Sequence, residues 1–469
     1  MMVASEEEGS SLRQRPLLGR RQGDISDERP VEFDFDVLRV KSRPGWLKRW
    51  NHIIVGFIWT YLHFRLTYNV TRHWQESYSI MSFIRHHYIS LSYVATYWML
   101  LITSVYSVFH YDQCVRFHVK NFDKFPDMYE DHANQAALMH ADLKNYSIYL
   151  QLFGALFLAP LRIVGGMLFF VAAMLFIGIP LTVLCGHFKT RSRQYAAFVF
   201  YYLTIYAFWG LGIYEVKTVY AEGVDREKPM NVISNHIGIV DVVYMLHSGS
   251  FSFVCKKSLE NAFIIGHFIK LLNCIVVDRH SAQNRKEVFW NIVERMQSID
   301  QGKEPISLMV YPEGTTSRGN ILLPFKHGSF GALVPLQPML VVLDYTYLNI
   351  TFDAFPWKWW VFHTFCSPIT TAFIAYWLPT IYPPGKEEIA IKGEQTCIRE
   401  YALYANRVMR EAILKLNPNV DRAYLQQRDV VVSPTLRQKL LARLYGPLLQ
   451  KQYRITDAEM RKTDEVVFQ

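Results

Sequence analysis

Two patterns of apolar residues divide this chain near residue 215. Before that point, apolar stretches of 16 to 23 residues are separated by polar or basic connectors. After it, apolar runs of three to seven residues alternate with polar stretches that have helical spacing. The first pattern is typical of helices in or on a membrane, and the second of strands alternating with helices. We therefore expect a membrane-associated helical region at residues 46–215 and a separate folded domain at residues 216–418.

The first two apolar stretches differ in how well they suit a membrane. Residues 89–109 are 21 residues without a charge, which is enough to cross a hydrocarbon core of ~30 Å. Residues 53–68 contain His63 and Arg65, so we expect this stretch to lie in the membrane interface.

A second pair of apolar stretches, residues 163–185 and 195–214, leads into the folded domain. It can be a spanning hairpin or a helix pair inserted in one leaflet, and the sequence does not distinguish the two. Arg162 precedes the pair. We expect its side chain to reach the lipid headgroups, and the alternative is a charge on a transport path.

The second half of the chain predicts an α/β domain with a substantial parallel component, because strands alternate with helices. The expected helices are residues 284–299 and 395–416. The expected strands are residues 230–234, 253–255, 275–277, 308–310, 339–343 and 371–377.

The two ends of the chain lie outside these two regions. Residues 1–45 are rich in charge and poor in apolar residues, so we expect a disordered tail. Basic residues at positions 39–49 precede the first apolar stretch and place this tail in the cytosol by the positive-inside tendency. Residues 419–469 are basic, with leucines at helical spacing. They can form an amphipathic surface helix or a helix packed on the domain.

Composition supports a membrane protein and argues against two other classes. Apolar residues make up 51% of the chain and charged residues only 19%, which is unusual for a soluble enzyme. The net charge of +9 comes without zinc-finger spacing or a long Lys/Arg run, so we expect anionic lipid rather than nucleic acid as the basic region's partner. The six cysteines are scattered, which argues against a disulfide framework or a zinc site.

The strongest chemical signal is Asn235-His236 followed by Asp241. Residues five apart do not share a helix face. They meet if His236 leaves the strand at 230–234 and Asp241 lies in the first turn of the next helix, where the helix dipole favours a carboxylate. Asp241 would then hold the imidazole in one tautomer as a base. The sequence offers no protein nucleophile beside this pair, so the attacking group is expected to belong to a substrate.

Three further constellations follow in the same domain. Arg279 and Arg285 present planar cations suited to phosphate, and surface salt bridges are the alternative. Glu313-Gly314-Thr315 follows a predicted strand and can recognise a hydroxyl or a phosphate, or simply close a turn. Lys326 is a third candidate cation for phosphate, and Gly328 beside it permits close approach of the backbone.

Together these blocks resemble the glycerophospholipid acyltransferase family. The resemblance rests on Asn235–Asp241 (NHxxxxD), Arg279, Pro312–Thr315 (PEGT) and the proline block at 334–338, and it covers roughly residues 228–416. The Phe-Lys-His-Gly-Ser-Phe stretch around Lys326, and Arg279 paired with Arg285, look like its lysophosphatidylcholine/lysophosphatidylethanolamine acyltransferase branch. The implied fold is a glycerolipid acyltransferase-type domain with a mixed, largely parallel sheet, preceded by hydrophobic membrane helices.

The resemblance implies an activity and a set of partners. His236 and Asp241 would be the catalytic pair, with Arg279, Glu313, Gly314 and Thr315 binding the acceptor's glycerophosphate portion. Acyl-CoA would be a co-substrate, and no cofactor is expected. The acceptor would be a lysophospholipid or a glycerol phosphate. The protein would sit in the endoplasmic reticulum, or in the Golgi, with the catalytic domain facing the cytosol.

Alternatives remain at this point. Thr316 replaces the arginine of EGTR that phosphatidic-acid-forming relatives often have, which weakens the reading as a glycerol-3-phosphate or lysophosphatidate acyltransferase without excluding it. A lipid-binding scaffold on an inactive domain is a non-enzymatic reading. A metal site made of His236, Asp241 and Glu313 is another, although no HExxH accompanies them. The sequence leaves open the headgroup, the acyl chain, the sn position and the oligomeric state.

Overall fold

The structure is a computed structural model. The residues that it describes are 33–39, 46–76, 79–124, 145–178, 189–225, 228–249, 251–260, 272–277, 282–345, 347–350, 357–368 and 371–420, with a few isolated residues elsewhere. Most of the expected N-terminal tail, the expected amphipathic C-terminal helix and Arg279 lie outside the described residues.

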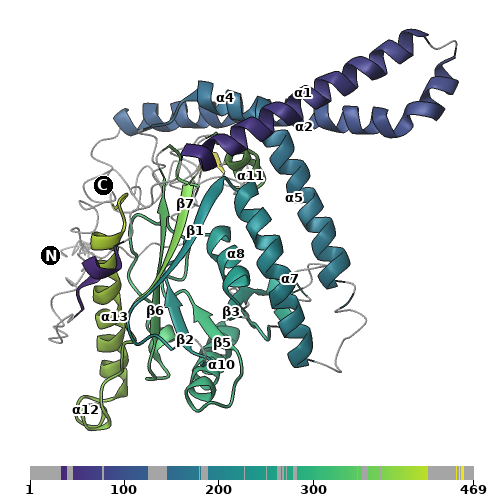
Figure 1. Ribbon diagram of the computed structural model, residues 1–469. Helices are drawn as coiled ribbons and strands as arrows, with labels where there is room; N and C mark the ends of the chain where they lie inside the picture. The colour runs from purple at the N-terminus through teal and green to yellow at the C-terminus, as the bar shows by residue number, and fades with distance from the viewer. Residues whose placement is uncertain are drawn as a thin grey trace, which may run out of the picture.

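The N-terminal half is helical. Helix α1 (Trp46–Glu76) and helix α2 (Ile80–Lys124) form a long hairpin that projects from the rest of the molecule (Figure 1). Three further segments follow: α4 (Ile148–Phe157), α5 (Ala159–Ala173), which continues as a π-helical turn to Gly178, and α7 (Lys189–Gly210). The stretch expected at the membrane interface, residues 53–68, is the middle of α1.

Among the residues that the structure describes, two helical segments are long and apolar enough to cross a membrane. They are Ile80–Gln113, with a mean hydropathy of 1.3, and Ala159–Phe176, with a mean hydropathy of 1.9. Only 22% and 35% of these segments are buried inside the protein. Because so much apolar surface faces outward, the helical half fits association with a membrane.

The folded domain contains a seven-stranded sheet in the order β1-β7-β6-β2-β5-β3-β4. Every neighbouring pair is parallel except β6 and β7. The expected mixed, largely parallel sheet is therefore confirmed. The strands are β1 (Ile213–Tyr220), β2 (Asn231–Ser234), β3 (Phe251–Lys256), β4 (Ile275–Val277), β5 (Ser307–Val310), β6 (Gln337–Asp344) and β7 (Thr371–Trp377).

Helices cover both faces of this sheet (Figure 1). On one face lies α8 (Ile239–Ser248), backed by α7. On the other lie α10 (Ala282–Asp300) and α13 (Glu394–Leu416), with the short α12 (Lys386–Lys392) leading into α13. Strand β6 contributes side chains to the cores on both faces of the sheet. Met339 and Val341 belong to the core under α8, and Leu340 and Val342 belong to the core under α13.

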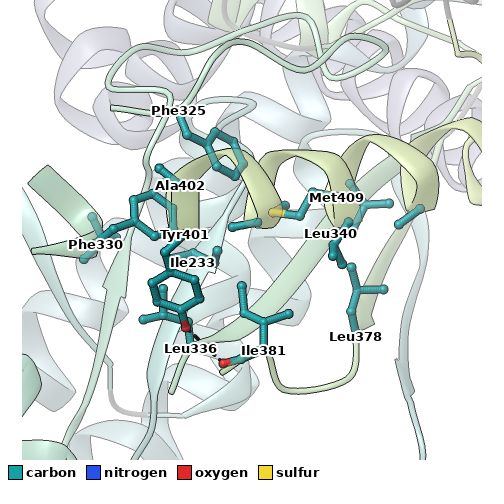
Figure 2. Close-up of a cluster of buried hydrophobic side chains, with 14 of the residues drawn as sticks. Ile233, Phe325, Phe330, Leu336, Leu340, Leu378, Ile381, Tyr401, Ala402 and Met409 are labelled. Atoms are coloured by element: carbon teal, nitrogen blue, oxygen red, sulfur yellow. Dashed lines mark hydrogen bonds between the residues drawn. The ribbon is translucent and has the colours of Figure 1, made fainter. Parts of the chain in front are cut away.

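The core under α13 is dense (Figure 2). Met409 and Tyr401 on α13 are fully buried, and burying an apolar side chain of this size contributes about 2 kcal/mol. The Tyr401 hydroxyl lies 3.0 Å from the carbonyl oxygens of Val334 and Ile381, so its polar end is satisfied.

Part of the N-terminal tail is ordered, contrary to the expectation for residues 1–45. The 3₁₀ helix η1 (Phe35–Leu38) packs against α13, with Phe35 and Leu38 buried in the core. Lys415 Nζ lies 3.3 Å from Asp34 Oδ1. Two buried apolar side chains explain why this short segment docks although the residues before it are strongly polar.

Strands β2, β5 and β6 run toward the end of the sheet where β7 and β1 begin, because β7 runs antiparallel to β6. Strand β2 ends opposite Met339, whereas the start of β7 lies opposite Asp344, farther along β6. Helix α11 (Trp357–Phe365) lies between this end of the sheet and helices α2, α4 and α5. The hydroxyl of Tyr347 donates to the Ser147 carbonyl oxygen at 2.7 Å, just before α4. The strand ends therefore face the apolar helices.

Arg162, expected at the lipid headgroups, is instead fully buried at this junction. Its Nη1 donates to the carbonyl oxygens of Phe365 and Ser367 at the end of α11. The expectation was wrong because α5 packs against α11 and leaves the arginine inside the protein.

Candidate active site

The candidate site begins where β2 ends. Asn235 is fully buried, and its amide forms two hydrogen bonds with the main chain of Val341 on β6, at 2.8 Å and 2.9 Å. The side chain thus continues the pairing of β2 with β6 by one residue. This fixes the backbone from which His236 emerges.

Asp241 lies in the first turn of α8, as the spacing predicted. Its Oδ2 lies 2.7 Å from Nδ1 of His236 and accepts the backbone N–H groups of Ile237 at 2.8 Å and Gly238 at 3.3 Å. The carboxylate is fully buried at the helix N-terminus, where the helix dipole and the free N–H groups favour negative charge.

This contact assigns the tautomer of His236. A carboxylate only accepts hydrogen bonds, so Nδ1 carries the proton and donates to Asp241. The other ring nitrogen, Nε2, is then an acceptor. The His236 side chain is 22% exposed while that of Asp241 is 0% exposed, so the base is reachable and its orienting carboxylate is not.

Tyr311 supports the imidazole from one side, a contact that the sequence did not indicate. The two ring centroids are 4.1 Å apart and the ring planes are 17° from parallel. Burial, and secondarily the charge of Asp241, raise the pKa of Tyr311 well above its ordinary value, so the phenol stays protonated. An aromatic residue directly after a strand that borders β2 is the only sequence signal for this contact.

Glu313 has a different place from the one expected. It is only 3% exposed, and its two oxygens accept the backbone N–H groups of His236 at 2.8 Å and Leu323 at 3.0 Å. Burial raises the pKa of Glu313 to about 7, although both hydrogen bonds act in the opposite direction. The carboxylate thus ties the His236 loop to the chain beyond the PEGT turn, and no direct contact with substrate is needed to explain it.

The PEGT turn brings Gly314 and Lys326 together. Gly314 has a φ of +67°, which favours glycine, and a Cβ at this position would lie 2.7 Å from Lys326 Cε. The Lys326 side chain therefore crosses directly over the turn, and its backbone N–H donates to the Pro312 carbonyl oxygen at 2.8 Å. Ser317 N–H donates to the His236 carbonyl oxygen at 2.7 Å, so the turn is also tied to the candidate base. Thr315 is partly exposed beside Gly314.

The two predicted arginines are not placed at the site. Arg279 lies outside the described residues, and Arg285 is located only as a position near the start of α10. Within the described part of the chain, no group of three or more His, Cys, Asp or Glu side chains could hold a metal ion.

The assembled residues suit proton transfer in an acylation. A histidine with one nitrogen fixed by a carboxylate and the other exposed can take a proton from a hydroxyl. Of the residues that the sequence predicts for the site, the structure shows His236 against Asp241 and Lys326 against Gly314. Sequence reasoning missed the main-chain groups of Leu323 and Ser317, which carry no side-chain signature.

Comparisons with known proteins agree with this chemistry. The sequence profile of the family described as Acyltransferase matches residues 215–343, which include the whole candidate site. The chain is 29% identical over 165 residues to lysophospholipid acyltransferase LPEAT1 of Arabidopsis thaliana, covering 35% of this chain and 41% of that protein. It is 27% identical over 298 residues to a lysophosphatidylcholine acyltransferase of Drosophila melanogaster, covering 60% and 51%.

Among solved structures, the 1-acyl-sn-glycerophosphate acyltransferase PlsC from Thermotoga maritima is similar to this chain. It has 18% identity and a TM-score of 0.36, and the match covers 53% of this chain and 96% of that chain. The chain spans about half the length of the curated relatives named above. Residues 215–343 thus match the acyltransferase family, and the similarity to these relatives supports the glycerophospholipid acyltransferases, in the branch of the lysophosphatidylcholine and lysophosphatidylethanolamine acyltransferases.

Proposed function

We propose that this chain is an acyl-CoA-dependent acyltransferase that esterifies a free hydroxyl of a lysophospholipid. The observation that carries the proposal is the 2.7 Å contact between His236 Nδ1 and Asp241, which orients the partly exposed imidazole as a base. The lysophospholipid acyltransferases among the relatives support this class of acceptor.

The mechanism follows from that geometry. The acceptor oxygen attacks the thioester carbonyl carbon while its proton moves to His236 Nε2, and Asp241 stabilises the resulting imidazolium. The tetrahedral intermediate collapses with cleavage of the C–S bond. The coenzyme A sulfur leaves and the proton returns to solvent or to the sulfur. No cofactor and no acyl-enzyme take part, and acyl-CoA is consumed as a co-substrate.

The oxyanion of the intermediate needs donors beyond the start of α8. The N–H groups of Ile237 and Gly238 already donate to Asp241, so they do not serve it. Lys326 beside Gly314 is positioned to bind the acceptor phosphate, with Thr315 next to it. Arg279 and Arg285 complete the proposed phosphate-binding set.

The membrane location belongs to the same proposal. Both substrates carry long acyl chains, and lifting a chain into water costs about 0.8 kcal/mol per methylene. A site that faces the apolar helices avoids this cost. We place the protein in the endoplasmic reticulum membrane, with the catalytic domain in the cytosol where acyl-CoA is present.

The test is an acyl-transfer assay on membranes containing wild type, His236→Ala or Asp241→Asn. The acceptors are lysophosphatidylcholine, lysophosphatidylethanolamine, lysophosphatidate and glycerol 3-phosphate. We expect His236→Ala to fall to background. Asp241→Asn removes the charge that fixes the tautomer, so its kcat should fall by about 10³-fold or more with little change in KM. His327→Ala, an exposed histidine outside the pair, should keep the wild-type rate.

The outcomes separate the rival functions. If His236→Ala keeps its rate, the assignment of the base is wrong. Exclusive use of lysophosphatidate or glycerol 3-phosphate would replace the acceptor class while leaving acyl transfer intact. A wild type that is inactive on all acceptors, with several acyl-CoAs, would favour the lipid-binding scaffold.

A further inference from the structure

Arg162 is a fully buried cation that the proposed mechanism does not use. It stands in the first turn of α5 and is 0% exposed. Its Nη1 donates to the carbonyl oxygens of Phe365 at 2.9 Å and Ser367 at 2.7 Å, where α11 ends. The negative end of the α11 dipole suits a cation at this place.

The opposite side of this guanidinium, Nε and Nη2, has no hydrogen-bond partner in the described part of the chain. Both nitrogens are buried. These two nitrogens form the side-on edge of the guanidinium, whose parallel N–H groups match two oxygens of a phosphate or carboxylate. The protein thus supplies acceptors for Nη1 and none for the edge formed by Nε and Nη2.

The charge is also unbalanced. Among the described residues, no carboxylate forms an ion pair with Arg162, and two neutral carbonyl oxygens only partly offset its burial. A buried charge without a counterion costs several kcal/mol. One oxyanion on the Nε–Nη2 edge would satisfy the buried N–H groups and neutralise the charge at once.

Gly212 packs against the guanidinium, and apolar side chains are exposed farther along α5. A Cβ at Gly212, which begins the turn into β1, would lie 3.6 Å from both Nη1 and Nη2, so the guanidinium packs directly beneath this glycine. The Thr364 hydroxyl on α11 is likewise buried without a partner. Beyond Arg162 on the same helix, Met167 and Leu168 are exposed, as expected of a surface against lipid.

We propose that the Nε–Nη2 edge of Arg162 is a binding site for a phosphate oxyanion, separate from the site around His236. Its ligand chemistry is that of a phospholipid headgroup or of inorganic phosphate. A headgroup bound here would join α5, α11 and the start of β1 through one anion.

The first test uses wild-type protein in detergent and needs no variant. Dioleoylphosphatidylcholine, dioleoylglycerol (the same chains without a phosphate) and inorganic phosphate are titrated separately, and the thermal unfolding midpoint is followed. Native mass spectrometry counts retained phospholipid. We expect phosphatidylcholine to raise the midpoint and dioleoylglycerol not to. A matching effect of inorganic phosphate would identify free phosphate as a sufficient ligand. No midpoint shift with either phosphate source would overturn the proposal.

The second test assigns the site to Arg162. Arg162→Met keeps much of the side-chain volume and removes the fork, and Arg65→Met on α1 is the matched control at an exposed arginine. Loss of two charge-assisted hydrogen bonds should raise the half-maximal phosphate or lipid concentration by about tenfold or more, with Arg65→Met unchanged. Equal responses of Arg162→Met and wild type would reject the site. If Arg162→Met does not fold, Arg162→Lys serves instead, because an ammonium keeps the charge without the planar fork.

Discussion

At the scale of single residues, Glu313 shows how a buried carboxylate organises the loop that carries His236. One oxygen accepts the backbone N–H of His236 and the other that of Leu323. The ionised carboxylate accepts these two hydrogen bonds more strongly than the protonated acid does, yet burial favours the neutral form. The two demands conflict near neutral pH, because the pKa of Glu313 is about 7.

This conflict predicts a pH-dependent stability. The folded-state pKa of about 7 is above the ordinary 4.5, so between these values the folded state binds more protons than the unfolded state. The free energy of unfolding should therefore fall as the pH rises through this window, by an amount on the order of 3 kcal/mol. Glu313→Gln does not titrate. The difference in thermal unfolding midpoint, Glu313→Gln minus wild type, should therefore increase as the pH is raised from about 5 to about 8.

Fluorescence-detected unfolding of the purified protein measures this difference. Glu222→Gln, at an exposed glutamate, should follow the wild-type pH profile. Parallel profiles of Glu313→Gln and wild type would show that Glu313 does not titrate in this window.

At the scale of elements, Asn235 joins two strands that the sequence separates by about a hundred residues. Its amide bonds both the N–H and the carbonyl oxygen of Val341 on β6, just beyond the last paired residue of β2. Asn235→Ala should cost about 2 to 4 kcal/mol, because two buried main-chain groups lose their partners. Chemical unfolding measures the change. The control is Asn419→Ala, which removes a single partly buried hydrogen bond of 3.2 Å to Leu343 on the same strand and should cost less. Equal losses would mean that Asn235 does not hold β2 to β6.

The elements also show what sequence patterns can reveal. Short apolar runs predicted six of the seven described strands. Such a run between polar helical stretches is too short for a helix and fits a buried strand. Strand β1 was missed because Ile213 directly follows the apolar residues of α7, so no polar boundary marks its start. The contact of His236 with Asp241 followed from spacing alone, whereas Arg162 was misplaced because the packing of α5 against α11 is a tertiary effect.

At the scale of the whole molecule, the arrangement of the sheet relates the proposed active site to the apolar helices. The carboxyl ends of β2 and β5 carry His236 and the PEGT turn, and both strands point toward the end of the sheet where α11 packs against α2, α4 and α5. Crevices at the carboxyl ends of parallel strands are the usual ligand sites of α/β sheets. Acyl chains entering from the membrane would thus reach the exposed base without crossing the domain.

This arrangement also decides how the orientation of the domain should be tested. The sequon at Asn349 is uninformative, because its Nδ2, the atom that would carry a glycan, donates to the Arg318 carbonyl oxygen at 2.8 Å. The turn before α12 is a better reporter, since Tyr382 is 64% exposed and a side chain at Gly385 would meet nothing within 4 Å. A protease recognition sequence inserted after Gly385 should be cut in sealed microsomes before detergent is added, because acyl-CoA is cytosolic. Cleavage only after detergent would place the domain in the lumen and contradict the proposed orientation.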